Sequence, residues 1–149
     1  MIRPLTEFDL SSLVLLESRG QLFPWSEDIF KLCFKSGYFG FGLEDESGLM
    51  GFILLSFQAS EAHVLNLCIH PDYQRRGLGY QLLIYALNQL RANGGGVVYL
   101  EVRCSNAPAI ALYQKIGFVE VAVRPGYYPA LHGREDAYLF AKDLSLDDE

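Results

Sequence analysis

The spacing of apolar residues changes several times along the chain. Apolar residues at every second position predict strands, and apolar residues at every third or fourth position predict helices. We therefore expect strands at 2–5, 38–43, 49–55, 62–69, 97–102, 118–123 and 137–141, and helices at 6–20, 26–37, 78–93 and 106–116. Because the strands alternate with helices, this order predicts a mixed α/β fold.

Helix caps support these boundaries. Ser26 precedes Glu27 and Asp28, which favour the positive end of a helix dipole. Gly117 follows the last predicted helix, at the position where a left-handed residue is common. Within the first helix, Leu10, Leu13, Val14 and Glu17 fall at helical spacing.

Composition narrows the class of protein. Half of the 149 residues are apolar, and 18 acidic residues exceed 12 basic ones, which gives a net charge of −6. An acidic surface repels phosphates, so we expect no nucleic-acid binding. Cys33, Cys68 and Cys104 match neither a disulfide framework nor zinc-ligand spacing, so we expect no metal.

The chain shows no secretory leader and no apolar run of ~18 residues. We therefore expect a cytoplasmic protein that does not interact with a membrane. No linker or repeat divides the chain, which predicts one domain over 1–149 with an acidic, frayed end at 143–149.

Residues 74–79 read Gln-Arg-Arg-Gly-Leu-Gly and lie between a predicted strand and a predicted helix. Glycine permits a close backbone approach, and the first amides of a helix form an anion site. The segment matches neither a P-loop nor the three-glycine dinucleotide motif. Its spacing alone leaves two interpretations open, namely a phosphate-binding loop or a glycine-rich helix entry with solvated arginines.

Two motifs together resemble the GCN5-related N-acetyltransferase (GNAT) superfamily. The segment 74–79 is similar to that family's acetyl-CoA pyrophosphate loop, and 106–118 is similar to its motif Asn-x-x-Ala-x-x-Leu-Tyr-x-x-x-Gly-Phe. The resemblance implies a largely antiparallel sheet whose fourth and fifth strands are splayed to admit acetyl-CoA. It also implies a set of cofactor contacts: Leu67, Cys68, Ile69, Gln74, Arg75, Arg76, Gly77, Leu78, Gly79, Tyr80 and Asn106.

Further segments resemble the bacterial ribosomal-protein-alanine N-acetyltransferases of this superfamily. They are 23–26, Asn66, 100–103, 105–106, 124–129 and 133–137. This resemblance implies that acetyl-CoA acetylates the N-terminal alanine of a small-subunit ribosomal protein by direct transfer in a ternary complex. We expect Trp25, Tyr127 and Tyr128 on the acceptor side, although each aromatic residue also suits a core or a turn.

Two other functions stay open. The first is acetylation of a small-molecule amine or a protein lysine by the same type of enzyme. The second is a non-catalytic acyl-CoA-binding domain. Candidate catalytic side chains at 101 and 113 favour an enzyme.

Glu101 is the candidate base. Strand alternation places it on one face with Val97 and Tyr99, where an unpaired carboxylate is costly unless it meets a partner or a wet cleft. Acyl transfer requires a neutral amine, and a carboxylate can remove the proton of an α-amino group at modest cost. The residues alone also suit a salt bridge to Arg103 or another cation, whereas the resemblance implies a proton acceptor.

Tyr113 is the candidate acid. It shares an apolar helical stripe with Leu112 and Ile116, which is typical of core packing, whereas the resemblance implies that its hydroxyl protonates the CoA thiolate. Asn106 suits a helix cap, a cofactor contact or both.

The remaining chemistry-bearing residues receive no role at this stage. Cys68 is more typical of a small core residue than of an acyl-carrying nucleophile. His63, His70 and His132 form no recognisable constellation.

Overall fold

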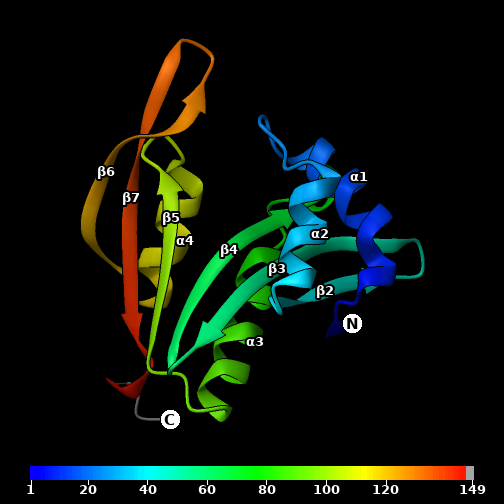
Figure 1. The fold of residues 1–149 in the computed structure, drawn as a ribbon, viewed down its shortest axis with the longest axis horizontal. Helices are drawn as coiled ribbons and strands as arrows, with labels where there is room; N and C mark the ends of the chain where they lie inside the picture. The colour runs from blue at the N-terminus through cyan, green and yellow to red at the C-terminus, as the bar shows by residue number, and fades with distance from the viewer. Residues whose placement is uncertain (147–149) are drawn as a thin grey trace.

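The computed structural model describes residues 1–146, which fold as a seven-stranded sheet with four α-helices (Figure 1). The strands are β1 (Ile2–Pro4), β2 (Phe39–Asp45), β3 (Gly48–Gln58), β4 (Glu61–Ile69), β5 (Val97–Arg103), β6 (Val119–Ala130) and β7 (Gly133–Asp143). The helices are α1 (Leu10–Gly20), α2 (Glu27–Lys35), α3 (Leu78–Ala92) and α4 (Ala107–Ile116). The predicted α/β class is confirmed.

The strands follow the order β1-β2-β3-β4-β5-β7-β6. Among these seven strands, β4 and β5 alone pair in parallel, and the other neighbours are antiparallel. The expectation of a mixed, largely antiparallel sheet is therefore correct. The parallel pair requires a long crossover, which α3 supplies.

The parallel pair opens part-way along its length. Pairing runs from Glu61 with Val97 to Val64 with Leu100, and beyond it β4 and β5 diverge (Figure 1). The register between β3 and β4 shifts at the same level, because Leu65 is an extra residue between the paired Val64 and Asn66. A bulge of this kind bends and twists a strand. It turns the end of β4 away from β5 and makes a gap in the sheet.

Each face of the sheet has its own core. On one face α3 packs on β2, β3 and β4 through a cluster that includes Leu82, Ala86 and Leu55. On the other face, α1 and α2 pack through a cluster that includes Leu16 and Phe30 (Figure 1). These two cores hold the diverging strands from both sides.

The hairpin of β6 and β7 is longer than the predicted strands at 118–123 and 137–141. Its pairing is interrupted between Arg124 and Tyr128 and resumes from Tyr128 with Glu135 to Ala130 with Gly133. Pro125 and Gly126 suggest a turn locally, and Gly126 does have a φ of 59°. Cross-strand pairing nevertheless continues past this bulge.

The chain end is ordered further than expected. The predicted frayed end at 143–149 is wrong for residues 143–146, because Asp143 pairs with Val97 and Leu144 is buried. The Leu144 N–H also donates to the Gly96 carbonyl at 2.6 Å. Residues 147–149 lie outside the described residues.

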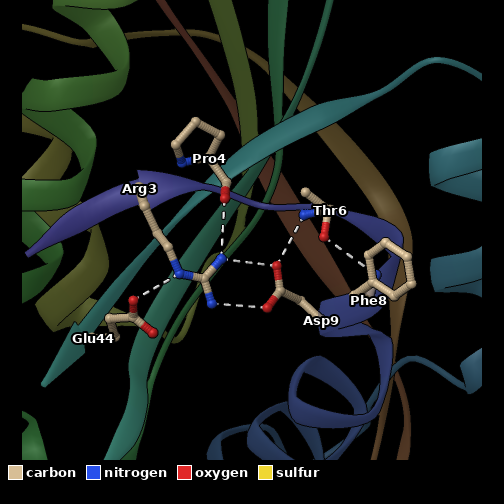
Figure 2. A network of polar contacts seen from close by, with 6 residues as sticks. All are labelled: Arg3, Pro4, Thr6, Phe8, Asp9 and Glu44. Atoms are coloured by element: carbon tan, nitrogen blue, oxygen red, sulfur yellow. Dashed lines mark hydrogen bonds and ion pairs between the residues drawn. The ribbon is translucent and has the colours of Figure 1, made fainter. Parts of the chain in front are cut away.

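A polar network fixes the start of the chain (Figure 2). The Arg3 guanidinium donates to both carboxylate oxygens of Asp9, at 3.0 and 2.8 Å, and to Glu44 at 2.8 Å. Asp9 also accepts the Thr6 N–H at 2.9 Å. The network ties β1 to β2 and to the start of α1, one of the helices that flank the gap in the sheet.

Candidate active site

A cavity of about 340 Å³ lies where β4 and β5 diverge. Its lining comes from α1, the loop after it, both diverging strands, the start and middle of α4, and β6. Six of the residues predicted for the site share this lining: Trp25, Leu67, Glu101, Asn106, Tyr113 and Tyr128. The fold therefore gathers side chains that are up to about a hundred residues apart in sequence.

Glu101 is oriented by the alternation of β5. Val98, Leu100 and Val102 point into the core, while Glu101 lies on the opposite face, as predicted. One carboxylate oxygen lies 2.5 Å from His63 Nε2, and the other accepts a hydrogen bond from Arg124 Nε at 2.9 Å. The side chain is 9% exposed, so these partners lie in a partly dry environment.

The partners of Glu101 differ from those expected. Arg103, the partner named from the sequence, instead pairs with Glu135 at 3.1 Å. His63, to which the sequence assigned no role, is the first cause of the lowered pKa of Glu101, and Arg124 lowers this pKa further. Glu101 is consequently ionised at neutral pH.

Tyr113 lines the same cavity and is also part of the core. Its ring lies 6.0 Å from that of Phe118 and 6.4 Å from that of Phe140. Burial raises the pKa of its hydroxyl to about 12. The hydroxyl keeps its proton at neutral pH, and no hydrogen bond within residues 1–146 engages it. Tyr113 therefore combines a packed ring with a proton that is available to a ligand.

Asn106 caps α4. Its side-chain oxygen accepts the Ala109 N–H at 3.2 Å, and the residue also lines the cavity. The two roles considered from the sequence are thus compatible.

The glycine-rich loop lies outside the cavity, at the start of α3. Gly77 adopts a left-handed φ of 76° directly before the first residue of α3, Leu78. The Gln74 side chain donates to the Ile69 carbonyl at 3.0 Å, which holds the loop against the end of β4. Arg76 lies over the Tyr73 ring, and Lys115 lies over the Tyr80 ring. The first-turn amides of α3 thus follow a bend that carries two arginines.

Aromatic and cationic side chains border the cavity on the side of α1 and β6. The Arg103 guanidinium lies over two rings, 5.1 Å from the centroid of Phe23 and 4.5 Å from that of Tyr128. Trp25 also lines the cavity and packs on Phe30. Tyr127 does not line the cavity and is 46% exposed, with its ring 4.9 Å from that of Tyr128.

Comparison with known proteins identifies the family. The acetyltransferase (GNAT) family matches residues 7–118, which is three quarters of the chain. This chain belongs to the acetyltransferase (GNAT) family. The mixed sheet described above is thus an acetyltransferase fold.

Relatives within the GNAT family match nearly the whole chain. The [ribosomal protein bS18]-alanine N-acetyltransferase of Escherichia coli (strain K12) is 39% identical over 97% of this chain and 98% of its own length. That of Salmonella typhimurium (strain LT2) is 38% identical over 95% and 96%. The crystal structure of the E. coli enzyme superimposes with a TM-score of 0.94 over 100% of this chain and 96% of that one.

Cys68 does not suit a covalent route in this GNAT protein. It is 2% exposed, and burial raises the pKa of its thiol to about 12. Its sulfur lies 3.8 Å from the Leu16 carbonyl, on the α1 side of the sheet. The thiol is therefore a poor nucleophile.

No role was assigned from the sequence to two residues that line this cleft or contact its lining. The first is His63. The second is Glu17, which is 2% exposed and accepts hydrogen bonds from Trp25 N–H at 2.9 Å and from Asn66 at 3.0 Å. Burial raises the pKa of Glu17. A carboxylate among the apolar positions of the first helix was the available signal, whereas nothing near His63 in sequence pointed to Glu101.

No metal site accompanies these residues. Within residues 1–146, no group of three or more His, Cys, Asp or Glu side chains is arranged to hold a metal ion. The helices of the same residues include none with the length and hydrophobicity to span a membrane.

Proposed function

We propose that this chain transfers the acetyl group of acetyl-CoA to the α-amino group of an N-terminal alanine, and that the acceptor is a small-subunit ribosomal protein. The observation that carries this proposal is the shared cavity lined by Glu101 and Tyr113 at the gap in the sheet. Near full-length similarity to the bS18-alanine enzymes supports the choice of acceptor.

The loop before α3 and the end of β4 suit acetyl-CoA. The amides of the first turn of α3 have no acceptor within the helix and lie at its positive end, where a pyrophosphate is favoured. Gly77 leaves open space where a Cβ would stand, and Arg75 and Arg76 add positive charge. Beyond Val64, β4 no longer pairs with β5, so its edge is free for the pantetheine arm. The cofactor supplies the thioester-bound acetyl group.

Glu101 is the proposed proton acceptor and Tyr113 the proposed proton donor. An ammonium loses one N–H proton to Glu101, directly or through water, before the nitrogen can attack. The N–C bond then forms as the C–S bond breaks, and Tyr113 gives its proton to the departing thiolate. The attached nitrogen loses its second N–H proton, which restores the Tyr113 hydroxyl directly or through water. The overall change converts an ammonium and a thioester into an amide, a thiol and one free proton.

An acceptor panel tests the proposed function. Purified protein is incubated with acetyl-CoA and one amine at a time: peptides that begin with alanine and carry the N-terminal sequences of small-subunit ribosomal proteins, the same peptides with a blocked N-terminus and a free lysine, and polyamines. We expect thiol release and acetylation, located by mass spectrometry, only with a free N-terminal alanine. Transfer only to lysine or a polyamine contradicts the proposed acceptor, and no thiol release with any amine contradicts an enzyme.

A matched pair of glycine variants tests where acetyl-CoA binds. Gly77 and Gly94 both have positive φ, 76° and 84°, and a Cβ at either position would meet no atom within 4 Å. Valine at either position carries a similar backbone strain, about 1–2 kcal/mol. Only Gly77→Val lies at the proposed pyrophosphate loop, so calorimetry should show weaker acetyl-CoA binding for it alone. Equal affinities of the two variants for acetyl-CoA would exclude the loop before α3 as the pyrophosphate site.

A further inference from the structure

The guanidinium of Arg103 contacts two separate segments that line the cleft. Arg103 lies two residues after Glu101 in β5 and on the same face of that strand, so about 7 Å separates their positions along it. Its Cζ lies 5.1 Å from the centroid of the Phe23 ring and 4.5 Å from that of the Tyr128 ring. Phe23 belongs to the loop between α1 and α2, and Tyr128 to the distal part of β6. Figure 1 shows both segments at the end of the molecule toward which β5 points.

Hydrogen bonds fix the position of this guanidinium. Its Nη1 donates to the Pro129 carbonyl at 2.6 Å and to the Glu135 carboxylate at 3.1 Å. Glu135 also accepts the Ser105 N–H at 2.9 Å, which ties the same group to the segment before α4. The side chain of Arg103 is 25% exposed, so these charged hydrogen bonds lie in a partly dry environment. Because a guanidinium is planar, can stack on rings and donates in several fixed directions, a lysine cannot make the same set of contacts.

The cleft leaves little room for an acceptor. Its volume of about 340 Å³ is near the lower end of the ~300–1,000 Å³ that is common for ligand pockets. The rings of Phe23, Tyr113 and Tyr128 take part in its lining, and the acetyl end of the cofactor would share it with the acceptor. Arg103 belongs to the same lining, so the contacts that hold Phe23 and Tyr128 also set the width of the cleft.

We propose that Arg103 is a positioning residue that determines which acceptor the cleft admits. This inference rests on the proposed function. By holding Phe23 and Tyr128, the guanidinium keeps the cleft narrow beside Glu101, where the α-amino group must reach its proton acceptor. A small first side chain such as that of alanine fits this space, whereas a large branched one meets the two held rings. The preference for an N-terminal alanine then depends on a side chain that takes no part in proton transfer.

Two acceptor peptides that differ only in their first residue test this role. One begins with alanine and the other with leucine, and kcat and KM are measured for each at saturating acetyl-CoA. Arg103→Lys keeps the positive charge but loses the planar fork. We expect the KM for the alanine peptide to rise about 3- to 30-fold, as for the loss of a partly desolvated cation–π contact. The kcat/KM for alanine relative to leucine should fall by about 10-fold, and the KM for acetyl-CoA should stay unchanged.

Two further variants separate this role from a general effect on folding. A loss of folded protein lowers the rates with both peptides equally and leaves their ratio unchanged. Phe23→Leu removes one of the two rings and should relax the preference in the same direction, and adding it to Arg103→Lys should give less than the product of the single effects. Arg134→Lys is the matched control, because Arg134 donates to the carbonyls of Gly126 at 2.7 Å and Tyr127 at 3.0 Å but does not line the cleft. It should keep the wild-type preference.

The outcomes distinguish this inference from the proposed function. An unchanged preference in Arg103→Lys overturns the role of Arg103, because the charge alone would then suffice, and an equal fall with both peptides overturns it too. Where Arg103→Lys does not fold, an unchanged preference in Phe23→Leu decides against it. Wild-type protein that uses both peptides equally also contradicts the inference, and N-terminal acetylation stands in each of these cases. Absence of transfer by the wild-type protein to every amine overturns the proposed function, and this inference with it.

Discussion

Asp9 and Glu101 are both carboxylates held by an arginine and a second polar group, yet they lie in different regions. Asp9 accepts two bonds from Arg3 and one from the Thr6 N–H, at the edge of the sheet (Figure 2). Glu101 accepts one bond on each oxygen, from His63 and Arg124, and lines the central cavity. The pKa of each is lowered, for Asp9 first by the hydrogen bond from Arg3 and for Glu101 first by the hydrogen bond with His63.

The two carboxylates differ in how their oxygens are engaged and in whether they line a cavity. Asp9 meets its guanidinium through both oxygens, in the paired geometry that a structural ion pair favours, and it borders none of the cavities described above. Each oxygen of Glu101 has one partner, and Glu101 lines the same cavity as the buried Tyr113. A lowered pKa therefore does not by itself identify a functional residue, whereas a lowered pKa beside a cavity makes Glu101 a candidate for one.

The largest expected effect follows from Glu101→Gln. Glutamine keeps the shape of the side chain but cannot take a proton, so kcat/KM at pH 7 should fall by the ~10²–10⁴-fold typical of a general base. The loss should shrink as pH rises toward the pKa of the amine, near 8 for an α-amino group and about 10.4 for lysine. Initial rates from pH 6 to 10 measure this recovery.

The control for this variant is Glu120→Gln, an exposed glutamate of β6. It should retain the wild-type profile. Because the folded pKa of Glu101 lies below its ordinary value of 4.5, the wild-type rate should show no acid limb from this group above that pH. Wild-type rates for Glu101→Gln at every pH would place Glu101 in the same class as Asp9.

Tyr113→Phe tests the second candidate catalytic side chain that lines the cavity. Phenylalanine preserves the contacts of the ring with Phe118 and Phe140 and removes only the proton donor. We expect a fall in kcat of up to the ~10²–10⁴-fold range of a general acid, with little change in acetyl-CoA affinity. Tyr138→Phe, in β7 beside Phe140, is the control. Normal turnover by Tyr113→Phe would mean that Tyr113 only packs in the core and is not the general acid.

Asp9→Asn tests the structural half of the comparison. Loss of the charged hydrogen bonds should destabilise the protein by roughly 1–3 kcal/mol at pH 7 and leave kcat of the folded protein unchanged. The folded pKa of Asp9 is lowered, so its contribution is present above the ordinary value of 3.8 and is lost as pH falls through the folded value. Denaturant unfolding of wild type and variant should therefore converge below pH 3.8. A fall in kcat of the folded Asp9→Asn protein would mean that Asp9, like Glu101, affects catalysis.

Local pattern predicted most of the elements and the side of β5 on which Glu101 lies, because both depend on residues close in sequence. The gap in the sheet was implied only by family resemblance, since the bulge at Leu65 has no local signature. The partners of Glu101 are 38 and 23 residues away, so tertiary pairing alone decides them. The long hairpin was missed for the same reason, because pairing across the sheet outweighed Pro125 and Gly126.

Glu17 extends the comparison to a carboxylate without a cation. Two neutral donors, Trp25 N–H and the Asn66 amide, satisfy its oxygens, and burial raises its pKa above the ordinary value of 4.5. For an acid with a raised folded pKa, stability is fully present below the unfolded value and is lost as pH rises through the folded value. Burial of Glu17 should therefore cost the wild-type protein stability as pH rises above 4.5.

Glu17→Gln removes this titration, and its effect should be the smallest of the four. Glutamine presents one acceptor oxygen to two donors, so one hydrogen bond is lost at every pH, worth about 1 kcal/mol. Apart from this constant loss, the free energy of unfolding of the variant should rise relative to that of the wild type as pH increases from 4 to 8. Glu46→Gln, in the exposed turn before β3, supplies the control slope. A difference that moves in the opposite direction would mean that Glu17, like Asp9 and Glu101, is stabilised as the anion.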